Sequence, residues 1–196
     1  MPEEHTHIVS SFDEELTRLN NIISQMGGLA ESQLISSIRS IVKRDSELAE
    51  KVILSDQRID VLEQEVQDFA VRLLALRQPM ADDLRQVVTA LKLSNDLERI
   101  GDLAKNIAKR AQVLNQIPPI RPVQAIPNMA KLAQEIIKDV LDAYIEGDAE
   151  KAHRVWERDQ EVDDMYNSLF RELLTYMMED PRNITASTHL LFIAKN

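Results

Sequence analysis

Apolar residues recur at helical spacing along most of the chain. From Leu48 to Leu76 they follow alternating steps of four and three, which only Ser55 interrupts, and a row of the same period runs from Leu93 to Leu114. Between Ser11 and Lys43 the apolar positions are Leu16, Leu19, Ile22, Ile23, Met26, Leu29 and Ala30. This spacing predicts three long amphipathic helices, and the short connections between them favour an antiparallel bundle.

Short polar and proline-containing segments mark the ends of these helices. Asp45-Ser46-Glu47 is a turn and cap that leads into the second helix. Gln78-Pro79 ends that helix, because proline has no amide hydrogen and disfavours a helical residue before it. Asp82 and Asp83 then suit the first turn of a third helix, where the helix dipole favours negative charge.

The second half of the chain has the same organisation. Four of the seven prolines fall between Pro118 and Pro127, which makes this segment the best linker candidate. A helix is expected from Met129 to Ile145, followed by a turn at Glu146-Gly147-Asp148. A further long helix ends at Asp180-Pro181, and a last helix begins near Ile184.

An internal repeat relates the two halves. Residues 49–60 match residues 152–163 at a constant offset, with identities that include Val52 with Val155, Asp56 with Asp159, and Asp60 with Asp163. We therefore predict an all-α fold of two homologous three-helix bundles, the second incomplete at its C-terminus. The predicted domains are a first bundle over 1–115, a proline-rich linker over 116–127, and a second bundle over 128–196.

Composition and charge exclude several classes of function. The chain has no cysteine, which rules out disulfides, thiolate zinc sites and cysteine nucleophiles. Its formal net charge of −10 argues against nucleic acid, whose phosphates are bound mainly by Lys and Arg. No apolar run approaches the roughly 20 residues of a membrane span, and the polar start Met1-Pro2-Glu3-Glu4-His5 is unlike a secretory signal. We expect a cytoplasmic protein.

Paired carboxylates are the most informative polar pattern. Three pairs lie four residues apart, each on one helix face: Asp56/Asp60, Glu98/Asp102 and Asp159/Asp163. Two of them recur at equivalent positions of the repeat, and hard oxygen ligands suit Mg, Mn, Ca or Fe. The same pattern also fits a solvated helix face, on which Lys92, Arg99 and Lys105 offset the charge.

The sequence offers no catalytic constellation. It has no nucleophile with a base and an orienting acid, no glycine-rich phosphate loop and no His-Glu-x-x-His helix. We do not expect an enzyme. Two alternatives stay open beside a metal-binding adaptor: a metal-dependent enzyme, such as a ferroxidase or phosphohydrolase that uses these carboxylates, and a purely structural helical adaptor.

Several motifs along the whole chain resemble one known family. Leu97-Glu-Arg-Ile-Gly-Asp102, with Ala104 and Asn106-Ile107-Ala108 after it, is similar to the third-helix signature of PhoU proteins. The segments Arg77-Gln-Pro79, Met26-Gly-Gly28 and Leu174-Thr-Tyr-Met-Met-Glu-Asp180 also resemble that family.

The resemblance implies both a cofactor and partners. It implies metal clusters of iron, or of Zn, Mg, Mn or Ca, held by Glu98 and Asp102 with Asp56 and Asp60, and in the second repeat by Asp159 and Asp163. It also implies a homodimer that links the ATPase of a phosphate ABC transporter to the sensor histidine kinase of the phosphate regulon. Such a protein reaches the membrane only through its partners and represses phosphate-starvation genes when phosphate is plentiful.

One departure from the family pattern concerns the second bundle. PhoU proteins repeat the Glu-Arg-Ile-Gly-Asp signature there, whereas this sequence ends at Lys195-Asn196. We expect the second metal site to lack half of its ligands, and apolar faces around Leu169, Leu173 and Leu190 to be exposed.

Overall fold

The computed structural model describes the backbone from Glu3 to Asn196 and the side chains from Phe12 onward. The first repeat contains four helices: α1 (Glu3–Val42), α2 (Ser46–Ser55), α3 (Gln57–Arg77) and α4 (Ala81–Leu114). The first helix therefore begins before Ser11, where the sequence pattern placed its start.

The second repeat has the same order of elements. A 3-10 segment, η1 (Arg121–Ala125), precedes α5 (Ile126–Glu146), α6 (Ala149–Glu157), α7 (Asp159–Glu179), η2 (Pro181–Asn183) and α8 (Ile184–Lys195). Each repeat is a three-helix bundle whose middle helix is divided in two, and the part of the chain that the structure describes contains no strand. The predicted all-α fold of two homologous three-helix bundles is confirmed.

The middle helix of each repeat was predicted to be continuous, and this prediction was wrong at one point in each. The helix is interrupted at Asp56 in the first repeat and at Arg158 in the second. At Asp56 the backbone stays helical, but Ile59 N donates to Asp56 O at 2.9 Å, a tighter i to i+3 bond. The Ser55 hydroxyl donates to Val52 O at 2.9 Å, and such back-bonding by serine bends helices.

The two repeats share the same kind of helix N-cap at the start of the middle helix. Asp45 accepts a hydrogen bond from Leu48 N at 2.9 Å, and Asp148 accepts one from Lys151 N at 2.8 Å. Both aspartates cap the first half of a divided middle helix, and an N-cap of this kind typically stabilises a helix by about 1 kcal/mol.

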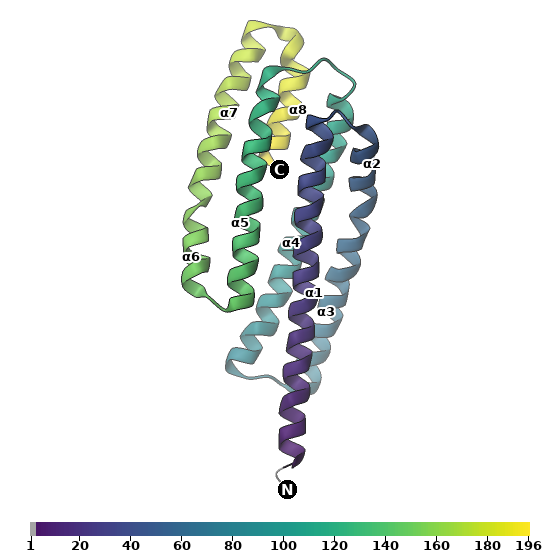
Figure 1. Cartoon of the computed structure of the whole chain (residues 1–196), viewed down its shortest axis with the longest axis vertical. Coiled ribbons are helices and arrows are strands. Elements are labelled where there is room, and N and C mark those ends of the chain that lie inside the picture. The colour runs from purple at the N-terminus through teal and green to yellow at the C-terminus, as the bar shows by residue number, and fades with distance from the viewer. Residues whose placement is uncertain (1–2) are drawn as a thin grey trace.

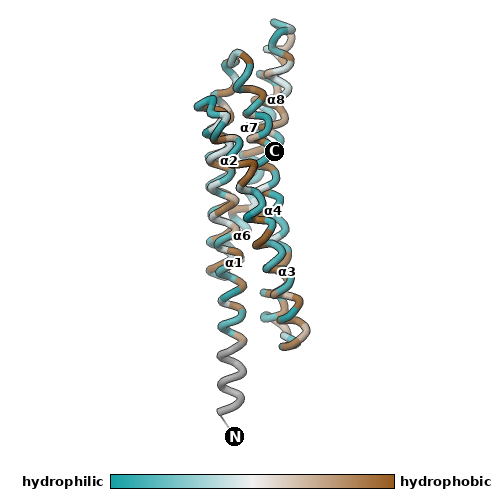
Figure 2. Tube along the Cα trace, turned by 90° about the vertical axis from the view of Figure 1, so that its right-hand side faces the viewer, coloured by the Kyte–Doolittle hydropathy of each residue, from teal (hydrophilic) through white to brown (hydrophobic). Residues whose placement is uncertain are grey.

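The two bundles pack side by side along their length (Figure 1). Helix α1 contacts α2, α3 and α4 of its own repeat and α5 of the other, while α4 contacts α8. In Figure 1, α5 lies between α1 and the α6–α7 pair. Figure 2 shows that the molecule is elongated and that apolar and polar residues are interspersed along its helices. None of the helices that the structure describes is long and apolar enough to cross a membrane.

A shared hydrophobic core joins the repeats. One cluster of buried residues combines Leu34, Ile38, Ile107 and Ala111 of the first repeat with Met129, Leu169, Leu173 and Leu190 of the second. The expectation of exposed apolar faces around Leu169, Leu173 and Leu190 was therefore wrong. Their exposed fractions are 2%, 0% and 1%, because α5, α8 and η1 pack against α7, and α4 packs against α8.

The proline-rich segment is partly structured. Pro122 is buried within η1, and α5 begins at Ile126, before the predicted helix start at Met129. The division into 1–115, 116–127 and 128–196 stays a prediction, although the helices on either side of the segment belong to different bundles.

A glycine allows the close approach of the two bundles. A Cβ atom on Gly27 would lie 2.4 Å from Leu141 Cδ1 of α5, whereas a Cβ atom on the adjacent Gly28 would meet nothing within 4 Å. Helix α1 continues through the Gly27-Gly28 pair, and the contact with Leu141 explains a glycine at position 27.

We expect Gly28→Ala and Gly27→Val to change stability in opposite directions. Gly28→Ala should raise the free energy of unfolding by about 0.5–1 kcal/mol, because alanine loses less backbone entropy in a helix. Gly27→Val should lower it by about 1–3 kcal/mol through overpacking against Leu141. Urea denaturation of both variants measures this, and equal shifts of the same sign would contradict the close approach.

Candidate metal site

Asp56 lies at the kink between α2 and α3 and is the most buried of the predicted ligands. Its side chain is 4% exposed, and its Oδ2 accepts a hydrogen bond from Lys105 Nζ of α4 at 2.5 Å. The same ammonium lies 3.3 Å from Asp102 Oδ1, one turn earlier on α4. These contacts raise the pKa of Lys105, chiefly through the hydrogen bond to Asp56.

Asp60 and Glu98 join Asp56 and Asp102 in one acidic cluster. Burial raises the pKa of Glu98, and the charges of Asp102 and Asp60 raise it further. The pKa of Asp60 is raised by burial and then by Asp56, while Lys105 opposes this effect. The structure thus brings the two predicted carboxylate pairs of the first repeat together across α3 and α4.

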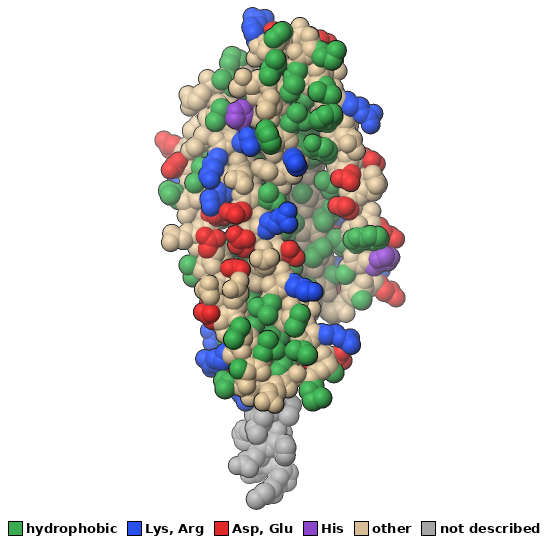
Figure 3. Space-filling view, turned by 180° about the vertical axis from the view of Figure 1, so that it is seen from behind, with side chains coloured by type: hydrophobic (Ala, Val, Ile, Leu, Met, Phe, Trp, Pro, Cys, Tyr) green, Lys and Arg blue, Asp and Glu red, His purple; other side chains and the backbone are tan. Residues whose placement is uncertain are grey.

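The cluster lies on an outer face of the molecule. Figure 3 shows acidic side chains gathered on this face, with Lys and Arg side chains beside them. Glu63, one turn beyond Asp60, also raises the pKa of Glu98, which places it in the same cluster. Glu63 was not among the predicted ligands, which were chosen at a spacing of four residues. Its spacing of three from Asp60 nevertheless puts it on the same helix face.

Two further residues behind the cluster were also missed. A Cβ atom on Gly101 would lie 2.9 Å from Ile59 Cδ1, 3.1 Å from Gln33 Oε1 and 3.3 Å from Asp56 Oδ1. Gln33 of α1 is 6% exposed, and its Nε2 donates to Ser55 Oγ at 3.2 Å, while its Oε1 is buried without a hydrogen-bond partner. The only sequence signal was a glycine inside a helix.

The donors fit a hard cation in type. Among the residues that the structure describes, no three His, Cys, Asp or Glu side chains form a ready metal-binding group. The cluster nevertheless offers carboxylate oxygens on two helices, and the pKa values of Asp60 and Glu98 are raised first by burial and then by the neighbouring carboxylates. Gln33 Oε1, which is buried without a hydrogen-bond partner, and Asp56 Oδ1 both lie close to Gly101. Oxygen-only donors of this kind suit Mg²⁺, Mn²⁺, Ca²⁺ or iron better than sulfur-seeking metals.

The predicted pair in the second repeat has different surroundings. Asp159 and Asp163 are exposed on α7, and no ion pair or hydrogen bond of their side chains occurs in the described part of the chain. The structure does not bring Asp159 and Asp163 together with the first-repeat cluster.

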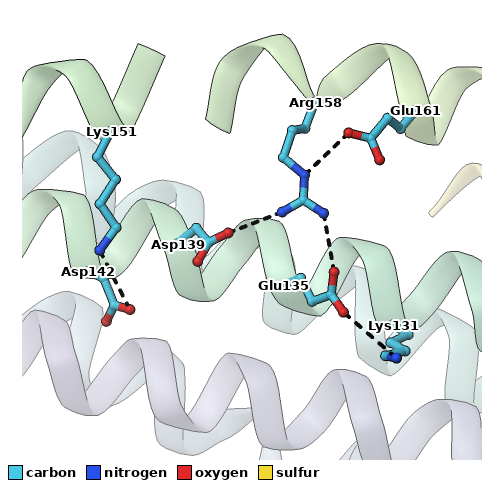
Figure 4. A network of polar contacts seen from close by, with 7 residues as sticks. All are labelled: Lys131, Glu135, Asp139, Asp142, Lys151, Arg158 and Glu161. Carbon is cyan, nitrogen blue, oxygen red and sulfur yellow. Dashed lines mark hydrogen bonds and ion pairs between the residues drawn. The ribbon is translucent and has the colours of Figure 1, made fainter. Parts of the chain in front are cut away.

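An arginine occupies the kink of the second repeat (Figure 4). Arg158 donates to Asp139 Oδ2 at 3.1 Å and to Glu135 Oε2 at 3.2 Å on α5, and to Glu161 Oε1 at 3.3 Å. These hydrogen bonds raise the pKa of Arg158, with that to Glu135 contributing most. Three of the carboxylates around this kink therefore share one arginine as their partner, whereas Asp159 forms no ion pair with it.

Asp56→Asn should destabilise the protein, whereas the repeat-equivalent Asp159→Asn should not. In chelator, loss of the charged hydrogen bond to Lys105 is expected to lower the free energy of unfolding by about 1–3 kcal/mol. The exposed Asp159 should change it by less than about 0.5 kcal/mol. Equal effects of the two substitutions in urea denaturation would show that the buried Asp56 and its hydrogen bond to Lys105 contribute nothing to stability.

In the absence of metal, Glu98→Gln should raise the free energy of unfolding, whereas Asp56→Asn should lower it. Because the pKa of Glu98 is raised from its ordinary 4.5 on folding, the folded state holds more protons, and stability falls as pH rises through that range. Removing the charge should raise the free energy of unfolding by about 0.5 kcal/mol at neutral pH and by nothing near pH ~3, where the carboxyl is protonated. Glu172→Gln, at an exposed glutamate of α7, is the control. A gain that persists in acid would contradict a charge origin.

Comparison with known proteins agrees with this fold. A family model described as the PhoU domain matches the chain twice, over residues 23–111 and 126–196. A Caulobacter vibrioides protein named "Phosphate-specific transport system accessory protein PhoU homolog" is 54% identical over 97% of this chain and 83% of its own length. A Rhizobium meliloti protein of the same name is 50% identical over 98% of this chain and 81% of its own length.

Solved structures give the same result. The crystal structure of PhoU from Pseudomonas aeruginosa has a TM-score of 0.90 and 36% identity, covering 94% of this chain and 88% of its own. The phosphate transport system regulatory protein PhoU from Streptococcus pneumoniae has a TM-score of 0.85 and 30% identity, covering 94% of this chain and 86% of its own. From the two domain matches, the relatives and the shared fold, the chain belongs to the PhoU family.

Proposed function

We propose that this chain is an accessory protein of a phosphate-specific transport system. In this proposal it acts in the cytoplasm as a homodimer and negatively regulates phosphate uptake and phosphate-starvation signalling. It does so by linking the ATPase of a phosphate ABC transporter to a sensor histidine kinase. The observation that carries the proposal is the 54% identity, over 97% of this chain, with a protein named as such an accessory protein.

The surface of the molecule supports a binding role. Large apolar side chains are exposed near the helix ends, with Met80 80% exposed, Met178 85% exposed and Leu76 71% exposed. Exposed apolar groups of this size are typical of protein contacts when they gather in patches. The net charge of −10 favours partners with basic contact surfaces.

The proposal includes a cation bound by the acidic cluster. Asp56, Asp60, Glu98 and Asp102 would hold it, and its identity is left open among iron, Zn, Mg, Mn and Ca. Such an ion would offset the negative charge of carboxylates that, after the larger effect of burial, raise one another's pKa values. Asp159 and Asp163 offer two further carboxylates at the equivalent positions of α7.

Partner binding by the purified full chain tests the proposal. We expect isothermal titration calorimetry to detect binding to the transporter ATPase or to the cytoplasmic part of the histidine kinase. Chelation, or the double substitution Glu98→Gln/Asp102→Asn, should weaken that binding about tenfold or more, the effect of losing roughly 1.4 kcal/mol. Glu172→Gln, outside the cluster, should leave it unchanged.

A reporter of phosphate starvation extends this test to cells. In a strain without its own PhoU protein, the wild-type chain should repress the reporter in phosphate-rich medium, and the double variant should not. Absence of binding to both partners together with absence of repression would overturn the adaptor role. Full activity of the double variant would favour the structural adaptor without a metal.

A further inference from the structure

A lysine already occupies the place where a cation would be held by the first-repeat carboxylates. Lys105 Nζ lies 2.5 Å from Asp56 Oδ2 and 3.3 Å from Asp102 Oδ1, so it joins the kink of the middle helix to α4. The lysine side chain is 29% exposed, whereas that of Asp56 is 4% exposed. A long, flexible lysine stem at the surface can move into solvent, but the aspartate at the kink cannot.

An unpaired neutral oxygen lies behind the same carboxylates. Gln33 Oε1 is buried without a hydrogen-bond partner, and Asp56 Oδ1 is the oxygen of that carboxylate that Lys105 does not contact. Both oxygens lie within 3.3 Å of the point where a Cβ atom of Gly101 would be. A buried acceptor without a partner is unfavourable, and a cation held by the neighbouring carboxylates would supply that partner.

We propose that Lys105 is the resident counter-ion of this site and competes with a divalent cation for Asp56 and Asp102. A divalent ion displaces the Lys105 ammonium toward solvent, takes over both carboxylates, and gains Gln33 Oε1 as a neutral oxygen ligand. This inference rests on the cation binding proposed above and deepens it, because it makes Lys105 the residue that sets the affinity of the site. A monovalent ion gains too little from the same carboxylates to displace the ammonium, so the lysine also selects for charge.

The structure offers a matched pair of lysines for the test. Lys109 is one turn beyond Lys105 on the same helix, is exposed, and makes no ion pair within the described residues. Titration of the full chain with Mn²⁺ at fixed ionic strength should show about tenfold or more tighter binding for Lys105→Met, because the ion no longer breaks two charged hydrogen bonds. Lys109→Met should bind within about twofold of the wild type, since its charge acts only through screened solvent.

A second measurement uses the unaltered protein. Mn²⁺ saturation should increase the acylation of Lys105 by an amine-reactive reagent several-fold, measured by peptide mass spectrometry, while the acylation of Lys109 stays constant. A further variant, Gln33→Leu, should weaken Mn²⁺ binding about fivefold, because a neutral oxygen ligand is lost.

The outcomes separate this inference from the proposed function. If the wild type binds Mn²⁺ but Lys105→Met binds no more tightly and Lys105 stays protected, the competition is overturned while the cation site stands. If neither protein binds Mn²⁺, the cation component of the proposed function fails and the competition fails with it. Unchanged binding by Gln33→Leu removes Gln33 from the ligand set.

Discussion

The close approach of α4 to α1 and α3 at Gly101 is the constraint on which the candidate site depends. A side chain at this position would meet Ile59, Gln33 and Asp56 at once. Because Gly101 has none, α4 comes near enough to bury Asp56 and to bring Lys105 to it from one turn away. A mid-helix glycine costs about 0.5–1 kcal/mol relative to alanine, and at this position the loss is offset by a contact that no larger residue would permit.

The charged residue at the interruption of the middle helix has opposite sign in the two repeats. In the first, the kink carries a buried acid, Asp56, that receives a lysine from α4. In the second, the kink carries Arg158, whose guanidinium joins Glu135 and Asp139 of α5 (Figure 4). At the first kink Lys105 contacts Asp56 and Asp102, and at the second Arg158 contacts Glu135, Asp139 and Glu161. The two repeats therefore share their architecture but differ in the sign of the charged residue at the kink.

Much of the fold followed from local signals in the sequence. The apolar period located the helices, Pro79 and Pro181 located their breaks, and the match of 49–60 with 152–163 revealed the duplication. The interruption at Asp56 was missed because its backbone angles stay helical and only the hydrogen-bond pattern changes. The burial of Leu190 was missed because it depends on contact with the other repeat, which periodicity within one helix does not encode.

The site was predictable only in part for a similar reason. A spacing of four residues placed Asp56 with Asp60 and Glu98 with Asp102, but it could not show that the two helix faces meet. Nor could it show that Gln33, 23 residues before Asp56 in the chain, contributes a buried oxygen from α1. Those facts arise from tertiary packing around a single glycine, where local pattern carries little information.

The placement of the carboxylates also bears on the kind of chemistry they support. Enzymes usually enclose their substrates in a cavity that excludes water. Here two of the described hollows, of about 470 and 400 Å³, are lined by the proline-rich segment with α1 and α8, and by α4 with α8, and the carboxylates line neither. The side chain of Asp102 is 51% exposed. A cation bound there, as proposed above, would change the charge of an exposed surface that a partner can contact.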